Sequence, residues 1–246
     1  MIEVEICLDA DDLTLLRQNV LAAKAGGARR IELCADMAQQ GLTPDMQAME
    51  TACGIFAQPA GVVVMVRPRA GDFCYDQNEL AQMQRSIQQA ADCGAGGVVL
   101  GCLTASAEVD RAALQTLTEQ AHQLGLKVTF HRAFDAVADP DRALECLLQC
   151  GVDRLLSAGT PWGSRQAVVS GLGQLHRLME RAKGRIELVV GGGVNSTNVP
   201  EILSTLPLHT GPLSVHSYSS VSDITGAGQA RVNTDKVRQL VQACQP

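Results

Sequence analysis

The chain has 246 residues, of which 46% are hydrophobic and only 3% are aromatic, and its formal net charge is −6. That length suits one large domain, because α/β barrels commonly contain about 250 residues. The negative charge and the scarcity of aromatic residues argue against nucleic-acid binding, and the lack of any run of about 20 apolar residues argues against a membrane span, so we expect a cytoplasmic protein.

Apolar segments of β-type composition recur about every 30 residues along the chain. We expect strands at Ile2–Leu8, Arg30–Cys34, Val62–Arg67, Gly97–Gly101, Leu126–His131, Arg154–Ser157, Ile186–Val190 and Leu213–His216. Segments with helical spacing lie between them, at Asp11–Ala25, Pro44–Ala57, Asn78–Cys93, Glu108–Leu124, Pro140–Cys150, Arg165–Ala182, Ser196–Thr205 and Asn233–Cys244. Start signals such as Asp139-Pro140 and glycines such as Gly151 stand where helices should begin and end.

This alternation of strands and helices predicts a (β/α)8 barrel, a TIM-like α/β fold, as a single domain over residues 1–246. A doubly wound open sheet is the alternative. No Gly-x-Gly-x-x-Gly turn follows the first strand, which weakens the dinucleotide-binding version of that alternative. In a barrel, functional residues are expected at the carboxyl ends of the strands.

Strand alternation predicts which side chains enter the barrel. Successive side chains face opposite sides of a sheet, so the apolar face of each strand should meet the helices. In the first strand, Val4 and Ile6 belong to that apolar face. The opposite faces of five strands carry these polar or thiol side chains: Glu5, Cys7, Glu32, Cys34, Arg67, Thr129, His131, Ser214 and His216. An apolar interior would satisfy packing, so this polar set indicates a function.

Four of the inward residues are candidates for general acid–base catalysis: Glu5, Glu32, His131 and His216. Carboxylate and imidazole pKa values can be tuned towards neutrality by their surroundings, as such catalysis requires. The alternative interpretation is structural. His131 would then be a satisfied core histidine, and Glu5 and Glu32 would neutralise nearby arginines in a buried ion network.

Arginines and glycines gather at the same expected rim. Arg67 and Arg69 follow the third strand, Arg132 follows the fifth, and Gly191–Gly193 follow the seventh. A guanidinium can hold an oxyanion with two parallel hydrogen bonds, and glycine allows the backbone to approach a ligand closely. We therefore predict a site for a small phosphate- or carboxylate-bearing molecule at Arg67, Arg69, Arg132, Gly191, Gly192 and Gly193. The triple glycine could instead form only a tight turn.

The nine cysteines show no paired spacing, so a disulfide framework is not expected. Cys7 and Cys34 occupy equivalent inward positions on the first two strands. Thiolates favour copper(I), zinc and iron–sulfur centres, and His131 or His216 could add a ligand. We predict Cys7 and Cys34 as a copper(I) pair. Cys146 and Cys150, one helical turn apart, are better explained by core packing.

The chain resembles the CutC family, which is named for copper homeostasis. The matching segments run nearly end to end: Val4–Cys7, Ile31–Cys34, Gly41–Pro44, Arg67–Phe73, Thr129–Asp135, Gly191–Val194 and Val215–Ser217. The resemblance implies a cytoplasmic TIM-like barrel that binds copper through cysteine and forms a homo-oligomer, with a dimer favoured. Leu8 stands where some relatives carry a second cysteine, and Gln40 and Ala70 stand where relatives commonly have glycine.

Two functions of different classes follow as hypotheses. The first is a CutC-like copper(I)-binding protein, and the second is a barrel enzyme that acts on a small anionic metabolite by acid–base chemistry. A barrel kept only as an interaction scaffold would leave the polar interior unexplained.

Overall fold

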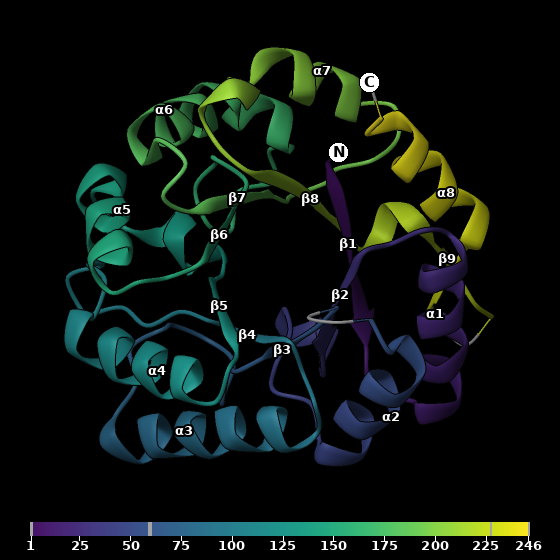
Figure 1. Ribbon diagram of the computed structural model, residues 1–246, viewed down its shortest axis with the longest axis horizontal. Helices are drawn as coiled ribbons and strands as arrows, with labels where there is room; N and C mark the ends of the chain where they lie inside the picture. Colours follow the sequence, from purple (N-terminus) through teal and green to yellow (C-terminus); the bar gives the residue numbers. More distant parts are fainter. Residues whose placement is uncertain (1, 59–60, 227, 246) are drawn as a thin grey trace.

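The computed structural model describes residues 2–58, 61–226 and 228–245. Parallel strands close into an eight-stranded barrel in chain order, with β1 hydrogen-bonded to both β2 and β8, and helices form a ring around it (Figure 1). The strands are β1 (Glu3–Asp9), β2 (Arg30–Cys34), β3 (Val62–Met65), β4 (Gly97–Leu100), β5 (Lys127–Phe130), β6 (Arg154–Ser157), β7 (Glu187–Val190) and β8 (Leu213–Ser217). The predicted (β/α)8 barrel is confirmed.

The helices of the outer ring are α1 (Leu13–Ala25), α2 (Met46–Phe56), α3 (Gln77–Asp92), α4 (Arg111–Gln123), α5 (Pro140–Gln149), α6 (Leu172–Ala182), α7 (Val199–Thr205) and α8 (Thr234–Ala243). Aspartate side chains accept hydrogen bonds from first-turn N–H groups at α1, α2, α3, α4 and α5. The predicted helix over 165–182 starts later, at Leu172, after a short 3-10 turn (Val168–Gly171). Gly171 packs tightly against Ala158 and Gly159 there, where any side chain would collide with the backbone.

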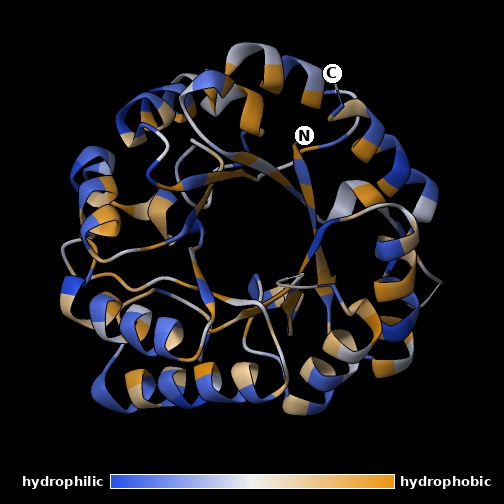
Figure 2. Cartoon of the chain, in the orientation of Figure 1, coloured by the Kyte–Doolittle hydropathy of each residue, from blue (hydrophilic) through white to orange (hydrophobic). Residues whose placement is uncertain are grey.

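Two separate apolar clusters hold the barrel together. The larger one lies between strands and helices and contains the outward residues of each strand, such as Ile6, Val64 and Phe130. The smaller one lies inside the barrel and contains Cys7, Cys34, Val63, Met65 and Val99. The surrounding helices alternate hydrophobic and hydrophilic residues, as expected for elements with one buried side (Figure 2). The interior is therefore a distinct compartment, partly apolar and partly charged.

A short antiparallel hairpin, β9 (Ser222–Ile224) with β10 (Ala230–Val232), follows β8 and was not predicted from the sequence. It is tied to α1 by Asn19, whose side chain donates to the Ala230 carbonyl and accepts from the Val232 N–H. Among the described residues, none of the helices combines the length and the apolar character that a membrane span requires.

Candidate functional site

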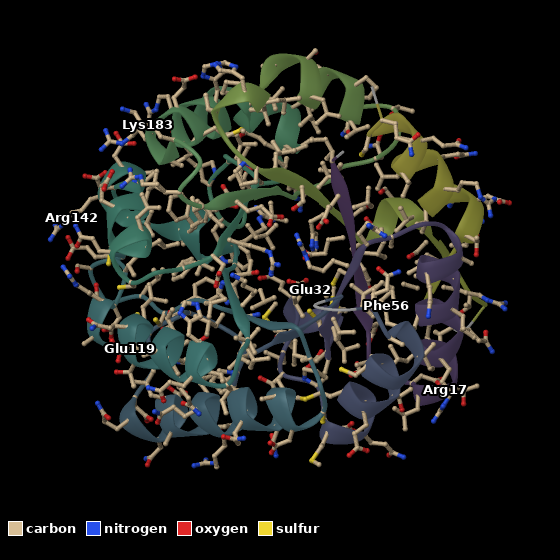
Figure 3. The ribbon with its side chains drawn as sticks, in the orientation of Figure 1. Arg17, Glu32, Phe56, Glu119, Arg142 and Lys183 are labelled. Atoms are coloured by element: carbon tan, nitrogen blue, oxygen red, sulfur yellow. The ribbon has the colours of Figure 1, made fainter. Side chains whose placement is uncertain are left out.

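A cavity of about 400 Å³ opens where the strands end, and it is lined by residues from β1, β2, β3, β8 and the segments that follow β3, β5 and β6. Cys7, Cys34, Glu32 and His216 belong to its lining, and so do Met65 and Tyr218. Glu32 lies inside the ring of strands, whereas Arg17, Glu119, Arg142 and Lys183 lie at the periphery (Figure 3). Of the nine residues that alternation directs inward, six therefore line one cavity: Cys7, Glu32, Cys34, Arg67, His131 and His216.

The two thiols face each other across neighbouring strands. Parallel pairing places Cys7 of β1 beside Glu32 of β2 and Asp9 beside Cys34. The Sγ atoms of Cys7 and Cys34 are 3.8 Å apart, both side chains are buried, and both cysteines are free. The Cys34 thiol also donates a hydrogen bond to Oε2 of Glu32 at 3.6 Å.

His216 connects this thiol pair to a buried ion network. Its Nδ1 lies 2.7 Å from Oε1 of Glu5, and its Nε2 lies 3.7 Å from Oε2 of Glu32. The other oxygen of Glu5 accepts a hydrogen bond from Nε of Arg30, whose side chain is almost fully buried. Arg30 also donates to Glu187 and to Ser214 at 2.9 Å each. Glu5 thus lies at the bottom of the site, with one carboxylate oxygen bonded to His216 and the other to Arg30.

The pKa values of the two carboxyl groups move in opposite directions. Burial alone would raise the pKa of Glu5, but the charges and hydrogen bonds of Arg30 and His216 lower it to about 2. Burial raises the pKa of Glu32 well above its usual range, with only partial relief from His216. The Oε1 atom of Glu32 is buried and has no hydrogen-bond partner among the described residues. Glu5 is therefore held as a carboxylate, while burial favours the protonated form of Glu32.

The pKa values of the two thiols and of the His216 imidazole are also shifted by their neighbours. The hydrogen bond between the two thiols, outweighing burial and helped by His216, lowers the pKa of Cys7 to about 6. The same hydrogen bond raises the pKa of Cys34 well above its usual range. Burial would lower the pKa of His216, but Glu32, Cys7 and Glu5 raise it. At neutral pH the site holds a Cys7 thiolate beside a His216 imidazolium, and thiolates are the form of cysteine that binds metals and reacts.

His131 occupies the mouth in a different state. Its Nδ1 accepts a hydrogen bond from the Ala133 N–H at 3.1 Å, which places the proton of the neutral ring on Nε2. Burial and the nearby charge of Arg67 lower the pKa of His131 to about 3. Its ring packs against Gly101 of the β4 end, where a Cβ would come within 2.5 Å. His131 is therefore a neutral hydrogen-bond donor at physiological pH.

The three predicted anion-binding arginines differ in their surroundings. Arg67 lines the cavity and donates mainly to backbone carbonyls of neighbouring loops. Arg132 also lines it, and its Nε donates to Asp135 at 2.8 Å. Arg69 lies outside the described lining and pairs with Glu79 at 2.5 Å and Asp72 at 2.9 Å. The structure thus brings two of the three arginines to the cavity.

The glycines that follow β7 also lie outside the described lining of the cavity. Gly191 packs against Leu156 and His216, and Gly192 packs against Ala158, so both permit close contact within the barrel rim. Gly192 and Gly193 have positive φ values of 95° and 86°, which favour glycine in a tight turn. Their geometry is fully accounted for by the turn.

Arg30 is the important residue that the sequence analysis missed. It shares a face of β2 with Glu32 and Cys34, so the same alternation that identified those residues would have directed Arg30 inward. Trp162 and Phe73, which form an edge-to-face pair in the cavity wall, were missed for another reason. They lie on loops, and no strand periodicity fixes where a loop side chain points.

The donor set of the thiol pair fits a soft metal ion. Ligand atoms of Cys7, Cys34 and Glu32 lie within 4.8 Å of one another, and those of Glu5, Glu32 and His216 form a second such group. Two sulfurs that each lie about 2.3 Å from a shared ion can be at most about 4.6 Å apart. The 3.8 Å separation of Cys7 and Cys34 satisfies that limit. Thiolate ligands select copper(I) over hard cations.

Comparisons with known proteins identify the family to which the chain is similar. The family model described as the CutC family matches residues 2–221. A family protein CutC from Vibrio campbellii is 35% identical over 98% of both chains, and one from Bacteroides thetaiotaomicron is 42% identical over 76% of this chain and 72% of its own. A crystal structure of a candidate copper homeostasis protein CutC from Streptococcus agalactiae aligns with a TM-score of 0.75 and 31% identity, covering 88% of this chain and 98% of that one.

Proposed function

The chain belongs to the CutC family, and from that premise we propose that it binds one copper(I) ion between Cys7 and Cys34 as part of copper homeostasis. The observation that carries the proposal is the pair of buried sulfur atoms 3.8 Å apart, one of them a thiolate at neutral pH. Their apolar surroundings, Val63, Met65 and Val99, exclude competing water from the sulfur side. The Streptococcus agalactiae relative is named as a copper homeostasis protein, which supports the proposed role in copper homeostasis.

The test is a copper(I) titration against a strong competing chelator. We expect one tightly bound ion per wild-type chain and its loss in the Cys7→Ser/Cys34→Ser double variant. The matched control is Cys146→Ser/Cys150→Ser, which removes another pair of interacting thiols, located at the end of α5. Equal stoichiometry and affinity in wild type and the Cys7/Cys34 variant would refute the proposal.

A second candidate function is proton transfer on a small anionic metabolite. The observation that favours it is His216, placed between two carboxyl groups whose pKa values have moved apart. Such a separation distinguishes a fixed base from an acid in enzyme sites. Here Glu5 would orient His216, and Glu32 would exchange a proton with the ligand.

Solvent exchange distinguishes this candidate from simple metal binding. If it operates, small carboxylates incubated with the protein in D2O should gain deuterium beside the carboxylate, and Glu32→Gln should abolish the gain. The same variant should still bind copper(I) through its two thiols. A panel of carboxylates without any protein-dependent exchange would eliminate the candidate.

Cellular location and assembly stay predictions. A cytoplasmic homo-oligomer, with a dimer favoured, is what the family resemblance implies.

A further inference from the structure

Arg67 is a buried cation without an anionic partner. Its side chain is 2% exposed, and its guanidinium donates to the carbonyl oxygens of Gln39 (2.8 Å), Gly41 (3.2 Å) and Gly71 (3.1 Å). These acceptors are neutral, and no carboxylate within ion-pair distance of Arg67 is found among the described residues. Buried charges in proteins are normally paired with an opposite charge. Among the described residues, this positive charge at the cavity wall meets neutral carbonyl oxygens and the face of the Phe73 ring, whose centre lies 5.1 Å from the guanidinium carbon, and no carboxylate.

Two buried N–H donors in the same wall also lack acceptors. Nε of Arg67 and Nε2 of His131 are each shielded from solvent and have no hydrogen-bond partner among the described residues. Both residues line the cavity, and the hydrogen bond at Nδ1 of His131 keeps its free nitrogen protonated. Leaving such a donor unsatisfied costs about 1–3 kcal/mol, so an acceptor atom from a ligand would stabilise each one.

Arg132 supplies a further set of donors from the opposite loop. Its Nε is held by Asp135, which also accepts from Ser157 and from the Ala158 N–H. The guanidinium carbon lies 5.3 Å from the centre of the Trp162 ring, which fixes its plane. Its terminal nitrogens make no hydrogen bond to any residue that the structure describes. The Arg132 side chain is 29% exposed, and its terminal nitrogens are available to bind a ligand.

We propose that the cavity mouth binds a small molecule through one oxyanionic group, a carboxylate or a phosphate, held by His131, Arg67 and Arg132. The cavity of about 400 Å³ is larger than a bare ion and falls in the range of small-molecule sites. Phe73 and Trp162 supply an apolar wall for the rest of the ligand. None of these residues belongs to the proposed copper pair, so the anion site does not depend on whether Cys7 and Cys34 bind copper.

Arg132, and not Arg67, is the residue to change. Arg67 connects the loops after β2 and β3 through backbone carbonyls, so its loss would disturb the fold as well as the site. In Arg132→Met, Asp135 keeps two of its hydrogen bonds. Arg69→Met is the matched control, because Arg69 is a neighbouring arginine, 38% exposed, that pairs with Glu79 and Asp72 outside the described cavity lining.

The experiment is thermal unfolding with acetate, pyruvate, sulfate or inorganic phosphate at matched ionic strength. At about 100 times its dissociation constant, a binding anion should raise the melting temperature of wild type by roughly 5–10 °C. The shift should persist in Arg69→Met and disappear in Arg132→Met. Shifts from carboxylates alone or from phosphate and sulfate alone would each support the site and identify the head group.

A measurement on the wild-type protein guards against a variant that fails to fold. In histidine-labelled protein, the Nε2 proton of His131 should move downfield when the anion binds, because it gains an acceptor. The proposal is overturned if no anion changes either the melting temperature or the His131 signal of wild type. It is also overturned if Arg132→Met keeps the full thermal shift, or if Arg69→Met loses it equally.

Discussion

His131 shows how one residue can be fixed in a single protonation state by its surroundings. The Ala133 N–H claims one ring nitrogen, the bare backbone of Gly101 allows the ring to approach β4, and Arg67 opposes a positive charge on it. Sequence alone suggested a residue that titrates near neutral pH. The folded protein instead keeps this imidazole neutral, so His131 acts as a hydrogen-bond donor and does not titrate near neutral pH.

The lowered pKa of His131 predicts a specific acid sensitivity. The unfolded chain binds a proton at His131 below about pH 6.5, whereas the folded chain resists it until about pH 3. The stability contributed by the neutral ring is thus complete above pH 6.5 and is lost as the pH falls towards 3. The slope for one such group is about 1.4 kcal/mol per pH unit.

Chemical unfolding of wild type and His131→Asn at pH 7, 6, 5 and 4 checks this expectation. The asparagine oxygen can still accept the Ala133 N–H, but it does not titrate. Wild type should lose its free energy of unfolding more steeply than the variant below pH 6.5. Parallel profiles for the two proteins would show that His131 does not carry the effect.

At the scale of strands, the alternation of side chains predicted most of the interior. A period of two residues fixes which side of the sheet a side chain occupies, and Glu5, Cys7, Glu32, Cys34 and His216 follow it. What the period cannot fix is which inward side chains meet, because that depends on barrel closure and side-chain reach. The structural alternative paired Glu5 with nearby arginines; because β1 lies between β2 and β8, its partners are Arg30 and His216.

Segments outside the strands were predicted less well, for local reasons. Asp45 caps α2, so that helix begins at Met46 instead of the expected Pro44. The strands of the β9–β10 hairpin are only three residues long each, and the hairpin is tied to the distant Asn19. The expected strand through Arg67 ends at Met65, and Arg67 lines the cavity while its guanidinium turns towards the carbonyls of two loops.

Arg30 joins four strands, so its replacement should lower the free energy of unfolding substantially, and a second substitution should restore part of that loss. Arg30 of β2 contacts Glu5 of β1, Glu187 of β7 and Ser214 of β8. Arg30→Met leaves the buried Glu5 carboxylate without its main cation, and removal of one partner from a buried pair costs about 3–5 kcal/mol. Denaturant unfolding should detect that loss.

Adding Glu5→Gln to Arg30→Met provides the control for this network. The neutral amide no longer requires a cation, so the double variant should recover part of the free energy of unfolding. An Arg30→Met protein as stable as wild type, or a double variant with purely additive losses, would contradict the network.

Over the whole molecule, the barrel interior is divided along its axis. Near the amino-terminal ends of the strands lies the ion network of Arg30, Glu5 and Glu187. Further along lie the thiols with His216 and Glu32, and at the mouth lie His131 and Arg132 beside the cavity. The Glu5 carboxylate fixes the position of His216. The hydrogen bond between the two thiols lowers the pKa of Cys7 and so favours its thiolate. This organisation supports the proposed soft-metal site at Cys7 and Cys34.

Copper-edge X-ray absorption of the protein loaded with one equivalent of copper(I) tests that account most directly, because it identifies the atoms bound to the metal. We expect sulfur scatterers from two thiolates in wild type and in Cys146→Ser/Cys150→Ser, and their loss in Cys7→Ser/Cys34→Ser. A spectrum with only nitrogen and oxygen scatterers, or one that the Cys7/Cys34 substitutions leave unchanged, would contradict the assignment of copper(I) to Cys7 and Cys34.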